Sequence, residues 1–345
     1  MRYIVIGPGG VGGAIGGLLA RAGHDVVLVA RGAHLEALRS GGLTVATPTE
    51  TFTVRPVVAA GPDDLTLTAG DAVLLAVKSQ DTAVVLDQWS YRPVWSASAT
   101  AGQAAEGTAA QCVPVFCVQN GVANEPVAAR RFARVYGVGV QMPAELLGPG
   151  QVVAPGSPVA GQLEIGRYPA GSGPAGERLA ADLSASGFIA RVTDDVMVAK
   201  YTKLLRNLRN AILAACGSMR SDAARTLAGM AVSEAEACFE AAGIRHLGLA
   251  AANAAREDVV QELPVNGRIR GGGSTWQSLN RRSGSTEVDY LNGEIVLLGR
   301  QHGVPTPVNE LLQVTVGVLA ARREAPGTVD PEDLLARALR AQGTR

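Results

Sequence analysis

Short, unbroken apolar runs recur through the first half of the chain. Residues 1–6, 25–30, 71–77 and 114–119 are largely apolar, and each run has the length of a strand. Strands of a parallel sheet covered by helices on both faces have this continuous pattern. Further strands are expected at residues 136–141, 161–165 and 188–192, with a small hairpin or strand pair at 43–45 and 51–57. The pattern predicts an α/β fold built on a doubly wound sheet.

From Asp194 onward the apolar positions follow a helical period. Asp194 and Asp195 are typical of a helix start, and the helix is expected to continue to about Ala215, with Gly217 just beyond it. The last helix is expected at residues 331–341. A chain of 345 residues favours two domains. We therefore expect a sheet domain over residues 1–192 and an all-helical domain over 193–345.

A segment of different composition interrupts the first half at residues 89–111. It opens with three aromatic residues, Trp89, Tyr91 and Trp95, and continues with Ala, Ser, Thr and Gly. We interpret it as a surface excursion, and a tolerated insertion is favoured over a lid. Gly- and Pro-rich stretches at 148–157 and 168–175 are expected to be hairpin turns or loops.

The composition excludes several kinds of partner. The 31 basic residues balance the 31 acidic ones, and no basic block occurs, which argues against nucleic acid or an anionic membrane. No uncharged apolar stretch approaches the ~20 residues of a membrane span. Four scattered cysteines fit a reduced, cytoplasmic compartment, and a first strand at Tyr3 leaves no room for a signal peptide. With four unclustered histidines, no metal site is expected.

The strongest motif is a glycine turn directly after the first strand. Gly7-Pro-Gly9-Gly10-Val11-Gly12 is followed by a helical run and then by the strand at 25–30. Gly7 permits the tight turn, Gly9 lets a pyrophosphate approach the backbone, and Gly12 lets the helix pack closely on the sheet. The N-terminus of that helix offers free N–H groups to the anion. This context predicts a Rossmann-like dinucleotide site.

The residue after the second strand indicates which dinucleotide binds. NAD sites place a carboxylate there for the ribose 2′-hydroxyl, whereas this chain has Arg31. A guanidinium suits a 2′-phosphate, so NADPH is the expected cofactor. The alternative is that Arg31 is an ordinary exposed cation.

Lysine is rare in this chain, which makes each one a candidate for proton chemistry. Of the 31 basic residues three are lysines, so 31 − 3 = 28 are arginines. Arginine stays protonated under ordinary conditions, whereas burial can lower the pKa of a lysine enough for it to exchange its proton. Lys200 is expected to be solvated. Lys78 and Asn120 each follow a predicted strand, at the sheet edge where ligands bind, so both are candidates for the cofactor and Asn120 also for the substrate.

Lys203 belongs to a polar stripe on the helix that follows Asp195. At ~100° per residue, Lys203, Asn207 and Asn210 fall within roughly 60° of one another. The stripe is either the wet side of the helix or the lining of a cleft that grips a carbonyl and a carboxylate. Because Arg206 and Arg209 form a separate edge, we favour the cleft.

These residues resemble the ketopantoate reductase (2-dehydropantoate 2-reductase) family over nearly the whole chain. The resemblance is carried by Gly7 to Gly12, Arg31, Val77-Lys78, Gln119-Asn120-Gly121, Lys203-Leu-Leu-Arg-Asn207 and Thr286-Glu287-Val-Asp-Tyr-Leu-Asn-Gly293. It implies an NADPH-dependent reductase with a Rossmann domain and a helical domain, and, by the family's activity, a place in pantothenate biosynthesis.

The resemblance also implies roles for single residues. Lys203 would be the general acid, and Glu287 would support catalysis and contact the substrate. Asn120 and Asn207 would bind cofactor and substrate. A serine that binds the substrate carboxylate would fall at Ser274 or Thr275.

Three positions depart from the family pattern. Ala211 stands where many members have a second asparagine, and Asn210 lies one place earlier. Leu279 replaces an aspartate. Asp81 replaces a glutamine and is expected to add a carboxylate near the nicotinamide side.

Three hypotheses follow. The first is reduction of 2-dehydropantoate to pantoate, with hydride from NADPH and a proton from Lys203. The second is a family relative that reduces another 2-oxo acid, ketone or imine in specialised metabolism. The third is an NADPH-binding sensor without turnover. A homodimer through the helical domain stays open.

Overall fold

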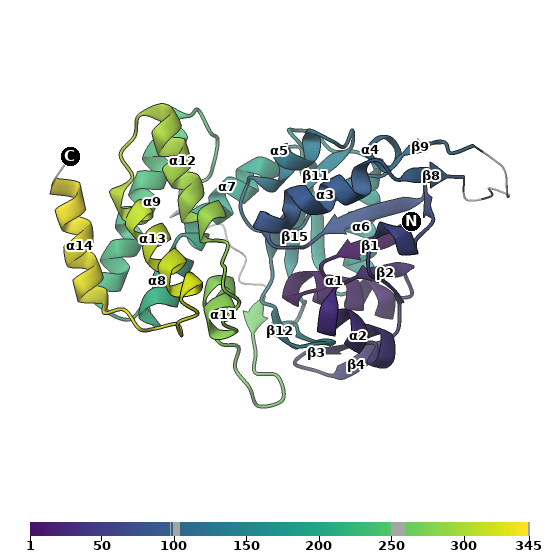
Figure 1. Ribbon diagram of the computed structural model, residues 1–345, viewed down its shortest axis with the longest axis horizontal. Helices are drawn as coiled ribbons and strands as arrows, with labels where there is room; N and C mark the ends of the chain where they lie inside the picture. The colour runs from purple at the N-terminus through teal and green to yellow at the C-terminus, as the bar shows by residue number, and fades with distance from the viewer. Residues whose placement is uncertain (97, 99–103, 250–259, 344–345) are drawn as a thin grey trace. The chain divides into compact units, whose positions relative to one another are not determined.

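The computed structural model describes the chain except residues 97, 99–103, 250–259 and 344–345 (Figure 1). The chain forms two compact units. Unit 1 comprises Met1–Met197 and Glu257–Arg270, and unit 2 comprises Val198–Arg256 and Gly271–Arg345. The expected domain boundary, between residues 192 and 193, lies five residues before the end of the first segment of unit 1 (197 − 192 = 5).

Unit 1 is built on an eight-stranded sheet with the order β16-β15-β11-β10-β7-β1-β2-β5. All neighbouring strands are parallel except β11 and β15, which are antiparallel. The strands are β1 (Arg2–Ile6), β2 (Val26–Val29), β5 (Val57–Ala59), β7 (Asp71–Leu75), β10 (Val115–Cys117), β11 (Val135–Gln141), β15 (Gln162–Arg167) and β16 (Ile189–Val192). The predicted fold class, a doubly wound α/β sheet, is confirmed.

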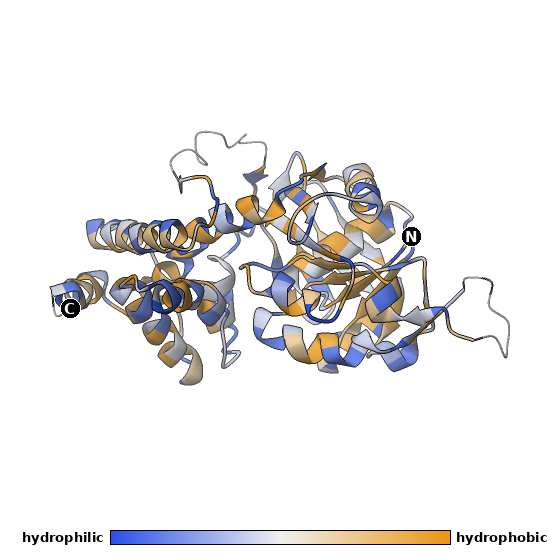
Figure 2. Ribbon diagram, turned by 90° about the horizontal axis from the view of Figure 1, so that it is seen from above, coloured by the Kyte–Doolittle hydropathy of each residue, from blue (hydrophilic) through white to orange (hydrophobic). Residues whose placement is uncertain are grey.

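Successive residues of the central strands face two different apolar layers. Val5 and Leu28 belong to one buried cluster, and Ile4 and Val27 belong to the other. In Figure 2 the strands inside this unit are largely orange, the colour of hydrophobic residues. Because side chains alternate across a strand, a sheet covered on both faces needs apolar residues at every position. This requirement explains the continuous apolar runs of the sequence.

The described helices of unit 1 connect these strands. They are α1 (Gly10–Arg21), α2 (Gly32–Gly41), α3 (Thr82–Ser90), α4 (Ala109–Cys112), α5 (Asn124–Ala129) and α6 (Pro174–Ala185), with 3₁₀ turns at Pro62–Asp64 and Ser79–Asp81. The helix α1 packs on β1 and β2, immediately after the glycine turn. The predicted order of strand, turn, helix and strand is therefore confirmed.

The described residues of unit 1 also form three smaller sheets. One has the order β12-β13-β3-β4, one pairs β14 with β17, and one has the order β6-β8-β9. The strands are β3 (Leu43–Ala46), β4 (Thr51–Val54), β6 (Leu67–Thr68), β8 (Pro93–Trp95), β9 (Gly107–Thr108), β12 (Glu145–Gly148), β13 (Gln151–Val153), β14 (Gly156–Ser157) and β17 (Gln261–Glu262). The predicted pair at 43–45 and 51–57 is the antiparallel hairpin β3-β4, although Val57 begins β5 in the large sheet instead.

The interpretation of residues 89–111 as a surface excursion was wrong at both ends. Trp89 lies in the last turn of α3 and is 2% exposed, because its ring packs into the apolar layer of Ile4 and Val27. At the other end, β9 pairs with β8 and leads into α4. The middle of the segment includes residues 97 and 99–103, which lie outside the described residues.

The segment Glu257–Arg270 returns to unit 1 from far along the chain. Within it, β17 pairs antiparallel with β14, and Val265 joins Ala46 and Val153 in a small buried cluster. Arg268 also binds the buried carboxylate of Glu145, with 2.9 Å between Nη2 and Oε1. Unit 1 is thus assembled from two separate stretches of sequence.

The described part of unit 2 is helical. Its helices are α7 (Val196–Asn207, from Val198 on), α8 (Arg209–Cys216), α9 (Asp222–Ala241), α11 (Ser274–Asn280), α12 (Asn292–His302), α13 (Pro307–Ala321) and α14 (Pro331–Gly343), with a 3₁₀ turn at Val288–Tyr290. The core around α9, α12 and α13 includes the buried side chains of Phe239, Ile295 and Leu312. Gly217 ends α8 in the left-handed conformation, as the sequence predicted.

The prediction of one helix from Asp195 to Ala215 was wrong at Leu208. The helix breaks there into α7 and α8. The buried amide of Asn292 donates from Nδ2 to the carbonyl oxygen of Leu208 at 3.4 Å. Helices kink where a side chain inserts into the backbone hydrogen-bond ladder, and no proline is present at this break. A tertiary contact therefore accompanies the break, and the local sequence does not display it.

Candidate active site

The residues of the glycine turn (residues 7–12) are held so closely that side chains would collide. Gly7 has a φ of +87°, and a Cβ atom there would lie 2.7 Å from Cγ1 of Val77. A Cβ atom on Gly12 would lie 2.5 Å from the carbonyl oxygen of Gly7 and 2.7 Å from Cβ of Ala76. Glycine is required at both positions, by backbone conformation at the first and by close packing at the second.

Gly9 has a different environment, because its outer side is open. No described atom lies within 4 Å of a Cβ atom built there. Gly9 is also the N-cap of α1, and among the described residues no side chain caps this helix start. The first N–H groups of α1 are therefore available to an anion. An open glycine beside an uncapped helix start fits the pyrophosphate of a dinucleotide.

His34 fastens the glycine turn to another loop, and the sequence reasoning missed it. The N–H of Gly150 donates to Nδ1 of His34 at 2.9 Å, so the proton of a neutral ring is on Nε2. Nε2 then donates to the carbonyl oxygen of Pro8 at 2.8 Å. The sequence signal for His34 was its position three residues after Arg31, in the first turn of α2.

Arg31 lies at the N-terminus of α2, and its side chain is exposed. Its guanidinium Nη2 lies 3.9 Å from a carboxylate oxygen of Asp81. Asp81 was expected near the nicotinamide side, and in the structure it lies beside the residue that was predicted to bind the 2′-phosphate.

Lys78 and Asn120 follow β7 and β10, which are neighbours in the sheet. Both side chains are partly buried. The structure thus brings them to the same sheet edge, as the sequence predicted.

A buried hydrogen-bond network joins the two loops that carry Lys78 and Asn120. Gln119 donates to the hydroxyl of Thr82 at 2.8 Å, and this hydroxyl donates to Oδ1 of Asn124 at 2.7 Å. Asn124 in turn donates to Oγ of Ser79 and to the carbonyl oxygen of Asn120. Gln119 and Asn124 were not predicted as positioning residues. Only the folded sheet shows that they bridge strands far apart in sequence.

Lys203 has the most perturbed electrostatic environment among the described lysines. Its pKa is lowered from 10.5 to about 7, chiefly by burial and also by the charges of Lys200 and Arg206. The carboxylate of Glu287, which is 6% exposed, opposes this effect and raises the pKa of Lys203. Unit 2 therefore holds the two predicted catalytic side chains in one electrostatic neighbourhood. A lysine with a pKa near 7 exchanges its proton readily at neutral pH.

The expectation that Lys200 is solvated was wrong. This side chain is 3% exposed. Its place one turn before Lys203 on α7 explains why its charge acts on Lys203.

Apart from Asn120 in unit 1, the predicted substrate residues fall at two places in unit 2. Nδ2 of Asn207 is buried and has no hydrogen-bond partner among the described residues. Asn210 lies against the N-terminus of α11, because its Oδ1 is 3.1 Å from the position of a Cβ atom on Gly273. Ser274 begins this helix, and Thr275 is 2% exposed. The structure thus places Asn210 beside Gly273, the residue that precedes Ser274.

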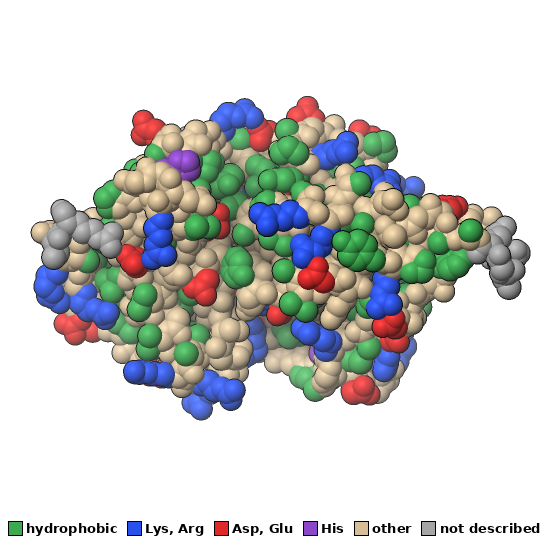
Figure 3. Space-filling model, turned by 45° about the horizontal axis from the view of Figure 1, so that its top comes forward, with side chains coloured by type: hydrophobic (Ala, Val, Ile, Leu, Met, Phe, Trp, Pro, Cys, Tyr) green, Lys and Arg blue, Asp and Glu red, His purple; other side chains and the backbone are tan. Residues whose placement is uncertain are grey.

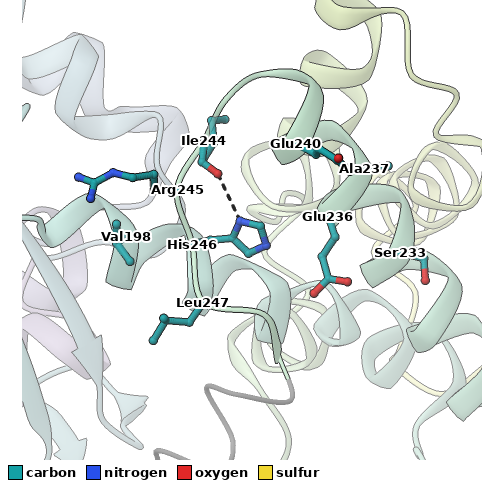
Figure 4. Close-up of a pocket in the computed structure, with 9 residues that line it drawn as sticks. All are labelled: Val198, Ser233, Glu236, Ala237, Glu240, Ile244, Arg245, His246 and Leu247. Atoms are coloured by element: carbon teal, nitrogen blue, oxygen red, sulfur yellow. Dashed lines mark hydrogen bonds between the residues drawn. The ribbon is translucent and has the colours of Figure 1, made fainter.

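Unit 2 also contains a hollow of about 850 Å³ away from these residues (Figure 4). It lies between the first turn of α7, one face of α9 and the loop after α9. Its lining consists of Val198, Ser233, Glu236, Ala237, Glu240, Ile244, Arg245, His246 and Leu247, none of them a predicted site residue. On the helix, Val198 and Lys203 are separated by about 140°, so the hollow and Lys203 belong to different sides of α7.

Charges and metal ligands add no further site. On the face shown in Figure 3, basic and acidic side chains are interspersed. Among the described residues, no three His, Cys, Asp or Glu side chains are grouped to hold a metal ion. The four cysteines, all within the described part, are free thiols. No helix in the described chain is both long and apolar enough to span a membrane.

Comparison with known proteins places the chain in a family. Two family models match it: ketopantoate reductase PanE/ApbA over residues 3–170, and ketopantoate reductase PanE/ApbA C terminal over residues 195–320. The 2-dehydropantoate 2-reductase of Mesorhizobium japonicum is 30% identical over 358 residues, which cover 94% of this chain and 99% of that protein. The chain belongs to the ketopantoate reductase family. The 2-dehydropantoate 2-reductase of Archaeoglobus fulgidus is 29% identical over 320 residues, covering 92% of this chain and 97% of that protein.

Solved structures agree with this assignment. A PanE/ApbA family ketopantoate reductase from Ralstonia eutropha JMP134 has a TM-score of 0.74 at 27% identity and covers 94% of this chain and 99% of its own. A D-mandelate dehydrogenase, solved with NADH and anilino(oxo)acetate, has a TM-score of 0.77 at 20% identity, covering 94% of this chain and all of its own (100%). The second likeness shows the shared fold. As a member of the ketopantoate reductase family, this chain is an oxidoreductase.

Proposed function

We propose that this ketopantoate reductase family member reduces a small 2-oxo acid with NADPH, and that the substrate is 2-dehydropantoate and the product pantoate. The observation that carries the proposal is the environment of Lys203. Its pKa is about 7, and its ammonium group interacts with the carboxylate of Glu287. When a ketone receives a hydride, negative charge grows on its oxygen. A nearby ammonium group stabilises this charge and then donates the proton.

NADPH, when bound, supplies the hydride. The glycine turn, with Gly9, Gly10, Val11 and Gly12, would hold its pyrophosphate, because Gly9 is open to a ligand and no side chain among the described residues caps the helix start there. Arg31 would bind the 2′-phosphate through its guanidinium.

The remaining cofactor contacts would come from the loops after β7 and β10. There the buried network of Gln119 and Asn124 fixes the loops that carry Lys78 and Asn120. The protein contributes alignment of the reactants rather than new chemistry.

Unit 2 would hold the substrate. The buried Nδ2 of Asn207, with no hydrogen-bond partner among the described residues, is available as a donor to a substrate oxygen. Asn210, Ser274 and Thr275 gather at the N-terminus of α11, where polar groups suit a carboxylate. In this proposal, Lys203 and Glu287 are the catalytic pair. Glu287 keeps Lys203 protonated over a wider pH range by raising its pKa.

A panel of 2-oxo acids tests the proposal through NADPH oxidation. Turnover with 2-dehydropantoate at a higher kcat/KM than with any other acid is the expected result. Turnover with other ketones or imines, but not with 2-dehydropantoate, would show a family relative with another substrate. NADPH binding with no oxidation of any member would indicate a sensor.

The matched variant for this assay is Lys203→Ala. A general acid contributes about 10²–10⁴-fold to the rate, so kcat is expected to fall by that factor while NADPH affinity stays within about twofold. An unchanged kcat would remove Lys203 from the mechanism. A homodimer and a cytoplasmic location stay predictions, and sedimentation and cell fractionation would check them.

A further inference from the structure

Two charged side chains meet beside the glycine turn, and one of them has the wrong sign for the expected cofactor. Asp81 follows β7, and Arg31 follows β2. The sheet order β7-β1-β2 places these strands on either side of β1, which carries the glycine turn at its end. Asp81 Oδ2 lies 3.9 Å from Nη2 of Arg31. The two loops thus reach one another beside the dinucleotide site.

Neither side chain is locked into this pair. The side chain of Arg31 is 74% exposed, and that of Asp81 is 47% exposed. Asp81 is the residue before α3, but among the described residues its carboxylate makes no capping bond to that helix. Exposed ion pairs are weak, so a ligand can displace Asp81 from Arg31. The carboxylate itself remains in the immediate neighbourhood of whatever Arg31 binds.

The charge of Asp81 opposes a 2′-phosphate in two ways. It competes for the guanidinium of Arg31, and it repels the phosphate directly. At about 5 Å and an effective dielectric of about 40–80, one such like charge weakens binding about 4- to 20-fold. A ribose 2′-hydroxyl has no charge to repel, and a carboxylate is the group that NAD sites use as its acceptor.

We propose that Asp81 is a specificity-determining residue that weakens the preference for the 2′-phosphate, so that the site accepts NADH as well as NADPH. This inference rests on the proposed cofactor role of Arg31 and the glycine turn. It differs from that role, because Arg31 alone predicts a strong preference for NADPH.

Binding of two small nucleotides tests the inference without catalysis. Adenosine 2′,5′-bisphosphate carries the 2′-phosphate and adenosine 5′-monophosphate lacks it, so calorimetric titration of both isolates that group. Asp81→Asn keeps the size of the side chain and removes its charge. We expect it to tighten binding of the bisphosphate about 4- to 20-fold and to leave the monophosphate within about twofold. With intact cofactors, the NADPH-to-NADH ratio of kcat/KM should rise by a similar factor.

Asp87→Asn is the matched control. Asp87 also lies on α3 and is exposed, but it pairs with Arg131 at 2.6 Å instead of Arg31. This variant is expected to change neither affinity. If the wild type binds both nucleotides and Asp81→Asn leaves their affinity ratio within about twofold, the role of Asp81 is refuted while the proposed function survives. If the wild type binds neither nucleotide, both the proposed cofactor site and the inference about Asp81 are refuted.

Discussion

The charge of buried Lys200 should set the pH range in which this reductase works. Lys203 donates its proton in the proposed reaction, and its pKa is about 7. Its protonated fraction is therefore high below pH 7 and falls as the pH rises above 7. The kcat for reduction should fall in the same range. Since the charge of Lys200 lowers the pKa of Lys203, Lys200→Gln should move this fall to higher pH.

The size of the effect follows from the helix. Lys200 and Lys203 are one turn apart on α7, where side chains lie about 5–6 Å from each other. Two unit charges about 6 Å apart interact by about 0.7 kcal/mol at the dielectric of water and by about 3 kcal/mol at an effective dielectric of 20. One pKa unit corresponds to about 1.4 kcal/mol. The midpoint of the kcat profile should therefore rise by about 0.5–2 pH units.

The assay is kcat at saturating NADPH and substrate from about pH 5 to pH 10. Lys200→Arg is the matched control, since it keeps the charge and should leave the midpoint where the wild type has it. Equal profiles for Lys200→Gln and Lys200→Arg would refute the electrostatic account. A wild-type kcat that does not fall on the alkaline side would refute the wider reasoning, because Lys203 would then not be the proton donor.

Three further predictions concern cofactor, stability and the helix break. Arg31→Ala should raise the KM for NADPH about 10- to 100-fold and the KM for NADH by less than about threefold, because one bidentate phosphate contact is lost; equal losses would contradict the phosphate role. Lys203→Met should lower kcat about 10²–10⁴-fold but raise the free energy of unfolding by about 1–3 kcal/mol at pH 6. The folded pKa of Lys203 lies below its unfolded value, so the wild type regains stability between about pH 7 and pH 10.5 and the gain of the variant should shrink there, as denaturant titrations at several pH values would show. Asn292→Leu should lower kcat about tenfold and leave NADPH binding unchanged, because Leu208 loses its side-chain contact. Glu234→Gln, which weakens buried contacts to the N-terminus of α13 and to the side chain of Asn309, should cost stability without lowering kcat, and equal kcat losses in both variants would contradict the prediction for Asn292.

The sheet unit was largely predictable from the sequence. Buried parallel strands are apolar at every position, and the glycine turn has a fixed spacing, so both features are local. Gly7 is required by its own backbone conformation, with a φ of +87°, and Gly12 by its approach to the carbonyl oxygen of Gly7 within the same motif.

The parts that escaped prediction depend on tertiary contacts. Lys200 was expected in solvent because lysine is mostly exposed, and only packing in the fold buries it. At the break, Leu208 is contacted by Asn292, which lies 84 residues further along the chain. The sequence also does not show that the loop of Asp81 reaches Arg31.

The candidate site was predictable by residue type more than by arrangement. Rarity drew attention to Lys203, and the structure adds the neighbours that lower its pKa. His34 carries no comparable signal, because its role depends on the tautomer imposed by Gly150.

The return of residues 257–270 to unit 1 limits how the protein can be divided. A fragment ending at residue 197 would contain the whole eight-stranded sheet and every predicted cofactor residue. Such a fragment would nevertheless leave β14 with an unpaired edge and expose Ala46 and Val153. The buried carboxylate of Glu145 would also lose its ion pair with Arg268. Glu145 packs against Gly10, so this damage would reach the start of α1. An isolated unit 1 would therefore have to include the segment with β17, connected to residue 197 by a new linker.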